Sequence, residues 1–529
     1  MRMKKILALL LALALAASLA ACASREQTSE TVLPEQSAGP DWDGETLLLA
    51  LLTNNGTTAG DRVPTPWQRH TLATSLMWRG LLAADSTLTR TEPDLAESVE
   101  ISGDGLTYTI TLKDGLKWSD GVDLTAADVI WSIQAVQQTP VKNSVYSNAF
   151  GRITELTAEG NVITMELSAP YGAMRDVLAQ FYILPEHCLA DADLTTLDTH
   201  DFWKEPVTSG YYRLDELYAG DCFTLVPNEY YEGTAPKIKK VKVSFVEDFL
   251  TAAQAGEAHY IYGNTTELYS AMDALEGFTT RNVGVLFYKY FLFNVRGSDG
   301  NVNEAMADVN VRRAIISAID RESLAALYPS AEVLNSGVPA SYAACEDFAY
   351  SYDPEEAKRL LEESEYDLAR PLRICCYNND RTSLDLIGAV AEDLEAVGFT
   401  VETVLSDDAA SDLFQVREYD IGFKGKTAFS VEEWYAEYRS TDRQFSQVFG
   451  GDTAFDEAVT ALNAATTAEE RNAALEALQA LEREMVYKLP ICAVGNAVYL
   501  SDALVIPEGV SFCDPRYACD VDFENWTFG

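Results

Sequence analysis

Apolar and polar positions alternate along the early part of the chain in a way that predicts strands followed by a helix. The segment 106–112 alternates apolar residues with threonine, which is typical of a half-buried strand. Glycine-containing turns follow this segment. Thr125 can then cap a helix with Asp128 in its first turn, and the apolar face of this helix consists of Val129, Ile130, Ile133 and Val136. This region therefore mixes strands with helices.

The later part of the chain shows the same mixture in a different order. An aromatic strand is expected at 287–295, and a strand, a helix and a second strand are expected at 372–377, 384–397 and 399–404. Thr467 predicts the start of a long Ala/Leu helix, and short strands return in the last 40 residues. We therefore predict a mixed α+β and α/β body with two lobes, in which the C-terminal segment returns to the first lobe.

The first 22 residues have the pattern of an export signal. A short basic start, Met1–Lys5, precedes the apolar stretch Ile6–Leu19, which is too short for a membrane-spanning helix of ~20 apolar residues. Cys22 directly follows Leu-Ala-Ala, and this sequence resembles the lipobox of bacterial lipoproteins. The resemblance implies cleavage before Cys22 and acylation of that residue, which would anchor the protein to the outer face of the cell membrane. The alternative is an ordinary secretory signal in which the cysteine has no such role.

Composition separates the signal at residues 1–21 from the folded body. Residues 22–44 are mostly polar and predict a flexible tether. The formal net charge is −43, and loss of Arg2, Lys4 and Lys5 with the signal makes it −46. Such a charge argues against binding to nucleic acid. It could attract cationic ligands, or it could serve only to keep the surface soluble.

Motifs for catalysis and metal binding are missing from the sequence. No histidine lies at metal-ligand spacing from another, so neither a metal nor a cofactor is predicted; the histidines are His70, His187, His200 and His259. There is no Gly-x-Ser-x-Gly motif, and Gly425-Lys426-Thr427 lacks the first glycine of a phosphate-binding loop. We therefore predict that the protein is not an enzyme.

The cysteines allow one disulfide prediction. Nine cysteines are present, and Cys513 and Cys519 flank a turn, so they are the best candidate pair in an oxidising compartment. Cys375 and Cys376 are adjacent on a predicted strand and should point to opposite faces of the sheet. The pairing of the remaining cysteines cannot be derived from the sequence.

Several segments, taken in order, resemble the extracellular solute-binding proteins of peptide-type ABC importers, known as family 5. This family includes oligopeptide-, dipeptide- and nickel-binding proteins. The segments are Pro93–Ser98, Gly105–Ile110, Leu116–Gly121, Leu124–Val129, Ile183–His187, Pro206–Tyr212, Asn228–Gly233, Phe293–Asn294, Val311–Ile315 and Ile319–Glu322. The resemblance implies fold type II of the periplasmic binding proteins, with two lobes and an extra subdomain in the first lobe. It places lobe 1 at 45–285, its inserted subdomain at about 63–205, lobe 2 at 286–490, and a return to lobe 1 at 491–529.

The chain departs from the family in the segment that holds the ligand. In peptide-binding relatives a Gly-Trp-x-x-Asp segment supplies an Asp that pairs with the α-ammonium of the peptide. Here the segment runs from Gly425 to Trp434, with Lys426 at the position of the Trp and Phe429 at the position of the Asp. Because a buried ammonium needs a charged partner, either Glu432 or Glu433 takes over this role, or the ligand is not a peptide with a free amine.

The resemblance also indicates which residues face the ligand. We predict that Lys426, Phe429 and Trp434 face the cleft, with packing in the core as the alternative for the two aromatic residues. Trp67 and Tyr146 should border the ligand from the first lobe. The full set of predicted ligand-binding residues is Trp67, Tyr146, Gly425, Lys426, Thr427, Phe429, Glu432 and Trp434.

The function implied by the resemblance is binding without chemistry. Two lobes close over a solute, a peptide in the first instance, and present it to the membrane permease of an ABC importer. Rival ligands are a metal chelate, an opine-like conjugate and an oligosaccharide, and a rival role is that of a receptor for a peptide signal. A monomer is expected.

Overall fold

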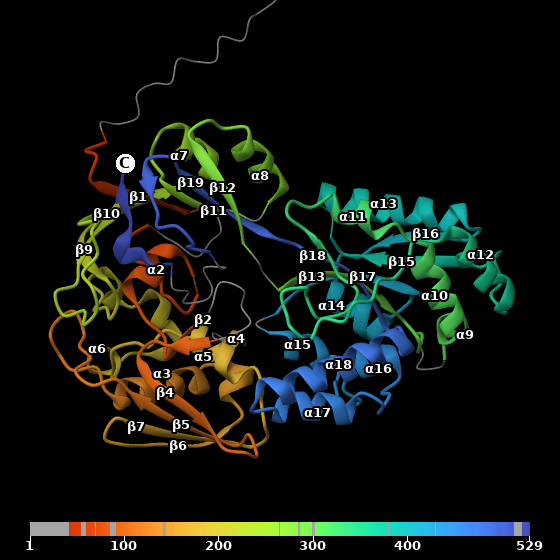
Figure 1. Ribbon diagram of the computed structural model, residues 1–529, viewed down its shortest axis with the longest axis horizontal. Coiled ribbons are helices and arrows are strands. Elements are labelled where there is room, and N and C mark those ends of the chain that lie inside the picture. Colours follow the sequence, from red (N-terminus) through yellow and green to blue (C-terminus); the bar gives the residue numbers. More distant parts are fainter. Residues whose placement is uncertain are drawn as a thin grey trace, which may run out of the picture.

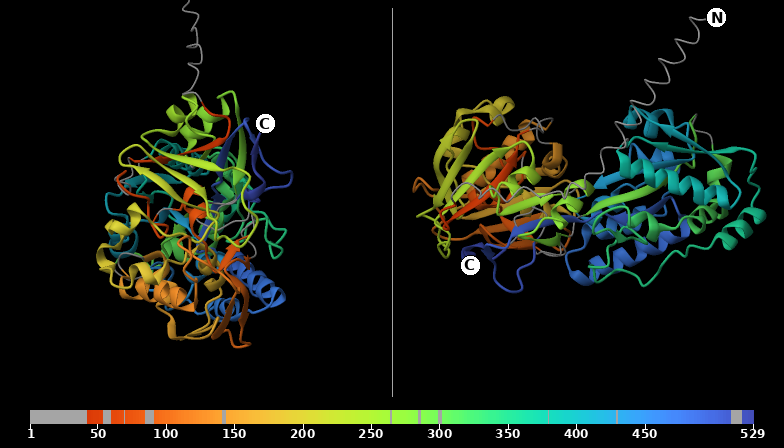
Figure 2. Two further views of the ribbon diagram at one scale, coloured as in Figure 1. Left: turned by 90° about the vertical axis from the view of Figure 1, so that its left-hand side faces the viewer. Right: turned by 90° about the horizontal axis from the view of Figure 1, so that it is seen from above.

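The protein consists of two lobes that lie side by side (Figure 1). Seen from above, they are two bodies with a narrower waist between them (Figure 2). The first lobe contains a seven-stranded and a four-stranded sheet, and the second lobe contains a six-stranded sheet. The computed structural model describes residues 42–53, 60–68, 70–84, 91–140, 144–263, 265–283, 286–298, 302–378, 380–428, 430–512 and 521–529.

The seven-stranded sheet combines strands from both ends of the chain. The strand order is β12-β19-β11-β1-β10-β9-β8, and β1 pairs in parallel with β10 and β11. The C-terminal strand β19 lies between β12 and β11, so the end of the chain is part of the first lobe. The strands and the two helices beside them are β1 (Thr46–Leu52), β8 (Tyr212–Tyr218), β9 (Cys222–Pro227), β10 (Lys240–Val246), β11 (Tyr260–Gly263), β12 (Phe278–Val283), β19 (Asn496–Ser501), α7 (Phe249–Gln254) and α8 (Thr266–Asp273).

The four-stranded sheet lies between β1 and β8 in the sequence. The predicted strand at 106–112 is confirmed as β5, and its residues alternate between buried and partly exposed. The predicted cap of the next helix, α3, is also confirmed, because the Thr125 backbone N–H donates to Asp128 Oδ2 over 2.8 Å. The elements of this part are α2 (Leu72–Met77), β2 (Leu82–Ala84), β3 (Thr91–Pro93), β4 (Ala96–Ile101), β5 (Thr107–Leu112), α3 (Ala126–Gln138), α4 (Ser144–Phe150), β6 (Ile153–Glu159), β7 (Val162–Leu167), α5 (Met174–Gln180), α6 (Glu186–Leu189), η1 (Leu194–Thr199) and η2 (Asp201–Lys204).

The second lobe is built on a mixed sheet with the order β14-β18-β13-β17-β15-β16. The predicted strand–helix–strand unit is confirmed, because β15 and β16 pair in parallel and α13 connects them. Cys375 and Cys376 lie in two different apolar clusters on opposite faces of β15, as expected. The strands are β13 (Phe287–Phe293), β14 (Glu332–Val333), β15 (Pro371–Cys376), β16 (Thr400–Leu405), β17 (Ile421–Thr427) and β18 (Lys488–Ala493).

Helices cover both faces of this sheet. They are α9 (Glu304–Ala307), α10 (Val309–Ala318), α11 (Arg321–Ala325), α12 (Pro354–Glu363), α13 (Arg381–Ala396), α14 (Ala409–Ser411), η3 (Asp412–Val416), α15 (Val431–Ala436), α16 (Phe445–Phe449), α17 (Asp456–Ala464) and α18 (Ala468–Met485). The chain ends in β20 (Leu504–Val505), η4 (Phe523–Asn525) and β21 (Thr527–Phe528). None of the described helices is both long enough and apolar enough to cross a membrane.

The chain crosses between the lobes at two neighbouring places. β12 and β19 pair in the first lobe, and the strands that continue from them, β13 and β18, pair in the second lobe. The Val494 backbone N–H donates to the Phe287 carbonyl over 2.9 Å at the crossing itself. Backbone pairing on both sides makes this two-stranded ribbon a natural hinge. We propose that the lobe boundaries fall within these two crossings.

Buried aromatic residues and one carboxylate organise the core of the second lobe. Trp434 is fully buried, and its ring centroid lies 4.6 Å from that of Tyr288. Glu482 accepts hydrogen bonds from the Trp434 indole over 2.7 Å and from the hydroxyls of Tyr435 and Tyr438 over 2.8 and 2.7 Å. The Gly337 backbone N–H is a fourth donor, over 3.0 Å, so this buried carboxylate is satisfied and the network is a specific part of the packing.

The described cysteines are all free thiols: Cys188, Cys222, Cys345, Cys375, Cys376 and Cys492. The predicted pair, Cys513 and Cys519, lies outside the described residues, and so does Cys22. The proposed disulfide and the acylation of Cys22 both stay predictions.

We expect Gly337→Ala to destabilise the protein, because an added Cβ would overlap the Trp434 ring. Overpacking of this kind costs roughly 1–3 kcal/mol. Gly388→Ala in α13 is the matched control, since a Cβ there meets nothing within 4 Å and should stabilise the helix by about 0.5–1 kcal/mol. Urea unfolding measures both variants, and equal stability of the two would show that the indole is not packed against residue 337.

Candidate functional site

A chamber of about 340 Å³ lies between the first lobe and the second. The four-stranded sheet and α5 form one wall, and α15 with the turn between α17 and α18 forms the other. Its lining residues are Thr91, Glu92, Ile101, Tyr108, Gly172, Arg175, Asp176, Glu432, Leu462, Ala465, Thr466, Thr467, Ala468 and Arg471. Because both lobes contribute, relative movement of the lobes would open or close this space.

The two walls approach each other closely at Gly172, just before α5. Its backbone N–H donates to Asn463 Oδ1 of the second lobe over 3.3 Å. A Cβ at this position would lie 3.2 Å from the Glu432 side chain and from the Leu462 carbonyl. The lobes are therefore in direct contact at this edge of the chamber, and glycine permits it.

Three carboxylates line the chamber, Glu92, Asp176 and Glu432, and Glu432 is paired with an arginine. Glu432 accepts from the Arg471 guanidinium at both oxygens, over 2.7 Å from Nε and 3.1 Å from Nη2. Burial would raise the pKa of Glu432, but Arg471 outweighs burial and lowers it. Such a bidentate pair is geometrically specific and strong.

Asp176 is the second carboxylate, and it has no ion-pair partner among the described residues. Burial and the nearby Glu432 raise the pKa of Asp176 from 3.8 to about 8. The neighbouring Arg175 is directed elsewhere, because its Nε donates to Thr91 Oγ1 over 3.0 Å. Below about pH 8 this carboxyl therefore keeps its proton when no ligand is bound, and a cationic group placed beside it would favour the ionised form.

Lys426 and its neighbours on β17 take part in a charge network of the second lobe. Lys426 Nζ lies 2.7 Å from Glu437 Oε1, and the fully buried Lys488 Nζ lies 2.6 Å from Glu437 Oε2. Burial alone would raise the pKa of Glu437, but the two lysines outweigh it and lower the pKa to about 2. Gly425 donates its backbone N–H to the Tyr377 hydroxyl over 3.2 Å, and Thr427 is exposed at the end of the strand.

The other predicted ligand-binding residues lie in packed regions. Trp434 is in the core of the second lobe, which is the alternative that the sequence left open, and Phe429 lies outside the described residues. The Trp67 indole donates to the Tyr182 carbonyl over 2.7 Å, and the Tyr146 hydroxyl donates to the Gln180 carbonyl over 3.2 Å. Both contacts lie at the C-terminal end of α5, and both side chains are buried. Contact of these residues with a ligand stays a prediction.

Sequence reasoning missed Asp176 as a candidate site residue. The sequence predicted that Glu432 or Glu433 replaces the ammonium-binding Asp of the relatives. The structure shows that Glu432 is already paired with Arg471. The signal that could have pointed to Asp176 is an Arg–Asp pair in the first turn of α5, a helix that is mostly apolar and otherwise uncharged.

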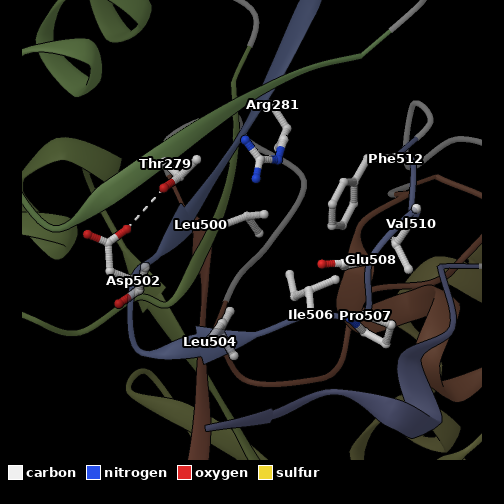
Figure 3. Close-up of a pocket in the computed structure, with 12 residues that line it drawn as sticks. Thr279, Arg281, Leu500, Asp502, Leu504, Ile506, Pro507, Glu508, Val510 and Phe512 are labelled. Atoms are coloured by element: carbon white, nitrogen blue, oxygen red, sulfur yellow. Dashed lines mark hydrogen bonds between the residues drawn. The ribbon is translucent and has the colours of Figure 1, made fainter. Parts of the chain in front are cut away.

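A larger cavity of about 650 Å³ lies within the first lobe (Figure 3). Residues of β12, β19 and the C-terminal segment line it, and Thr279 Oγ1 donates to Asp502 Oδ1 over 3.0 Å at its edge. Since none of the described residues that line it belongs to the second lobe, lobe closure would not enclose a ligand there. The chamber between the lobes is therefore the better candidate.

The two-lobed architecture with a shared chamber defines a class of proteins that bind a solute between closing lobes. The chain belongs to the bacterial extracellular solute-binding proteins, family 5, whose "Middle" region it matches over residues 90–456. The description of this family places its members outside the cytoplasm. Solved structures confirm the predicted fold class, type II of the periplasmic binding proteins.

Three proteins illustrate these similarities. A Brucella ovis relative named for ABC transporter peptide binding is 27% identical over 342 residues, covering 61% of each chain. The dipeptide-binding protein of Lactococcus lactis is 28% identical over 311 residues, covering 50% of this chain and 54% of its own. The structure of NikZ from Campylobacter jejuni in complex with Ni(L-His) superposes with a TM-score of 0.65 at 21% identity, covering 92% of this chain and 100% of that one. The chain thus spans about three fifths of the length of the Brucella relatives that it matches.

We expect Arg471→Met to destabilise the second lobe by about 2–4 kcal/mol, because it leaves Glu432 buried without a partner. The double variant with Glu432→Gln should recover part of this loss, since the unpaired charge is then removed as well. Lys358→Met, in the exposed pair with Glu355, is the control and should change little. Urea unfolding that finds Arg471→Met no worse than Lys358→Met would contradict this role of the pair.

We expect the stability of the protein to fall as the pH rises from about 4 to about 8, in part because of Asp176. The folded protein keeps a proton on this carboxyl that the unfolded chain releases, so higher pH favours unfolding. Asp176→Asn should flatten this dependence and stabilise the protein at about pH 9 by roughly 1–2 kcal/mol, since one pKa unit is worth about 1.4 kcal/mol. Unfolding measured across this range in both proteins checks the prediction, and parallel curves would refute it.

Proposed function

We propose that the protein is the solute-binding component of an ABC importer and that it captures short peptides between its two lobes. The family and the fold support this proposal. The binding event involves no covalent step: the lobes close over the peptide about the two-stranded ribbon, and the closed form is delivered to a membrane permease. The protein is accordingly not an enzyme.

The observation that carries the peptide proposal is the chamber with Asp176, whose carboxyl group has no ion-pair partner among the described residues. The α-ammonium of a peptide would pair with Asp176 in the first lobe and lie near Glu432 in the second. Such a ligand would bridge the two walls and reduce the electrostatic repulsion between the ionised forms of Asp176 and Glu432. Closure and capture would then be coupled through one charged group.

The size of the chamber favours a short ligand. A volume of about 340 Å³ lies at the low end of the roughly 300–1,000 Å³ that is typical of small-molecule sites. Backbone groups and bound water at the rim would accept varied side chains. The dipeptide-binding relative in Lactococcus lactis is consistent with this size.

A metal chelate is the second candidate ligand, because the related structure of NikZ is a complex with Ni(L-His). None of the described residues that line the chamber is a histidine or a cysteine. A chelate would therefore bind through its organic part, and an anionic one would meet Asp176 unfavourably. An opine-like conjugate, an oligosaccharide and a role in signal reception are alternatives with less support.

We further propose that Cys22 carries a lipid anchor and that residues 22–44 tether the body to the membrane, as the sequence indicates. The protein would then work as a monomer on the outer face of the membrane. Its large negative charge fits a role without nucleic acid.

The peptide proposal is tested by calorimetric titration of the full chain with a set of dipeptides and with their N-acetylated forms. We expect the free dipeptides to bind at least about tenfold more tightly, because acetylation removes the charge that pairs with Asp176. Asp176→Asn should weaken binding of the free dipeptides by a similar factor and leave the acetylated forms unchanged. Asp191→Asn, an exposed carboxylate of the first lobe, is the matched control.

Two outcomes would count against these assignments. Equal affinity for free and acetylated dipeptides would exclude an ammonium site in the chamber. Absence of binding for every dipeptide, with a chelate bound instead, would overturn the peptide assignment and leave the solute-binding class intact.

A further inference from the structure

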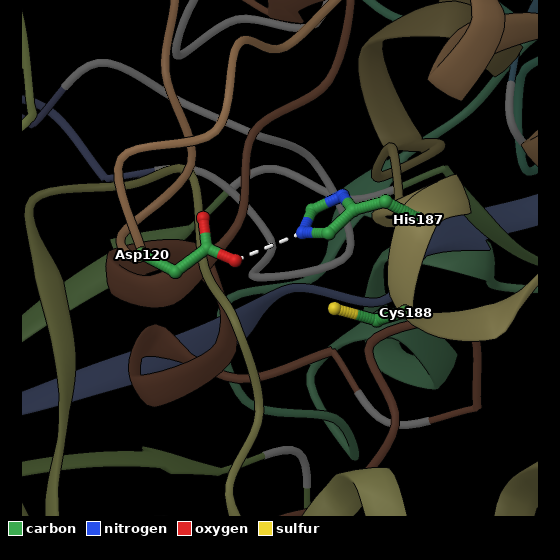
Figure 4. Close-up of side chains that lie close together, drawn as sticks. All are labelled: Asp120, His187 and Cys188. Atoms are coloured by element: carbon green, nitrogen blue, oxygen red, sulfur yellow. Dashed lines mark hydrogen bonds and ion pairs between the residues drawn. The ribbon is translucent and has the colours of Figure 1, made fainter.

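Three side chains with metal-binding atoms meet on the first lobe, away from the chamber. Asp120, His187 and Cys188 each offer one such atom, and these atoms all lie within 4.8 Å of one another. Figure 4 shows the Asp120 carboxylate and the Cys188 thiol on the same side of the His187 ring. Asp120 and His187 are 67 positions apart in the sequence, so a search for metal-ligand spacing along the chain does not detect this cluster.

Asp120 is held by its own turn through one oxygen, and its other oxygen lies against His187. Its Oδ1 accepts from the Val122 backbone N–H over 3.0 Å, and its Oδ2 lies 2.9 Å from His187 Nε2. The left-handed conformation of Gly121, with φ of 87°, closes this turn. The carboxylate is therefore oriented before any ligand arrives.

His187 and Cys188 are positioned by α6, and α6 is fastened to α3. The Glu186 backbone N–H donates to Asp128 Oδ1 over 2.9 Å, and the Leu184 backbone N–H donates to Ser132 Oγ over 3.0 Å. Since the turn that holds Asp120 leads directly into α3, one helix fixes both halves of the cluster. Such support from the surrounding residues is what a preorganised site requires.

We propose that Asp120, His187 and Cys188 form a binding site for a divalent transition-metal cation of the Zn²⁺ class. Thiolate, imidazole and carboxylate are the ligands that Zn²⁺ prefers, at about 2.0–2.3 Å from the metal. Three protein ligands leave a fourth position for water or a partner ligand. The Asp120 oxygen and the His187 nitrogen would give up their mutual hydrogen bond for the shared cation.

The charge around the cluster favours a cation. The Asp120 carboxylate lies in the cluster itself, and the Asp128 carboxylate holds the N-terminus of α6 beside it. The nearby Lys117 is directed to Asp123, at 2.6 Å, so it does not neutralise the cluster. His187 and Asp120 retain 29% and 35% exposure, which leaves a path for the ion.

The site is separate from the proposed peptide chamber and goes beyond the proposed function. α6 lies on the side of the first lobe that faces away from the second lobe (Figure 1). A bound cation would tie α6 to the turn before α3 and stabilise the first lobe by mass action. Loss of the cation would leave peptide capture between the lobes intact.

The test uses the full chain and its Cys188→Ser variant, with Co²⁺ as a spectroscopic substitute for Zn²⁺. We expect the original protein to show a thiolate-to-Co²⁺ charge-transfer band that the variant lacks. Subtracting the spectrum of the variant from that of the original protein removes the contribution of any ion bound elsewhere. Zn²⁺ should bind at least about tenfold more weakly to Cys188→Ser and to His187→Ala, since even outer-shell changes cost 10- to 100-fold. Cys345→Ser, a partly exposed free thiol of the second lobe, and His200→Ala are the controls.

A second measurement separates metal binding from folding. Zn²⁺ should raise the unfolding temperature of the original protein and of both controls, and leave that of Cys188→Ser unchanged, while all four unfold alike with a chelator present. The proposal is overturned by a charge-transfer band of equal intensity in Cys188→Ser and the original protein, or by Zn²⁺ affinity that falls less than about tenfold in Cys188→Ser or His187→Ala. The dipeptide titrations test the peptide proposal separately, so failure of the metal-site proposal does not change their outcome.

Discussion

The two-stranded ribbon between the lobes is the constraint on which the rest of the structure depends. β12 and β19 pair in one sheet, and their continuations β13 and β18 pair in the other, so a rotation of one lobe bends both crossings together. The backbone hydrogen bond from Val494 to Phe287 resists separation of the strands. Such pairing favours a hinge movement that bends the two crossings together. The chamber lined by both lobes is the place where this movement would enclose a ligand.

At this chamber, charge decides how the lobes meet. Gly172 allows close approach, and the approach brings Asp176 of one lobe towards Glu432 of the other. Arg471 forms its ion pair with Glu432 and attracts Asp176 without pairing with it. A cationic group between the walls would remove the remaining repulsion, which links capture of such a ligand to closure in simple electrostatic terms. The buried Glu437, held by Lys426 and Lys488, shows the contrasting case of a carboxylate that is fully compensated within one lobe.

Local pattern was enough to predict much of the fold. The alternation in β5, the Thr125–Asp128 cap of α3 and the strand–helix–strand unit around α13 are visible in short windows, because each depends on neighbouring residues. The opposite orientation of Cys375 and Cys376 follows from the two-residue period of a strand. Family resemblance supplied the lobes and the type II fold, but it could not supply the partners of individual charges.

The sequence by itself determined the elements, the fold class and the family of this protein, since these follow from local periodicity and from ordered motifs. Only the tertiary structure decided which charges meet: Lys426 pairs with Glu437 and Glu432 pairs with Arg471, whereas Asp176 has no ion-pair partner among the described residues. It also decided that Asp120, His187 and Cys188 converge. The physical reason is that Coulomb and ligand interactions depend on distance in space, and the packing of distant segments sets that distance.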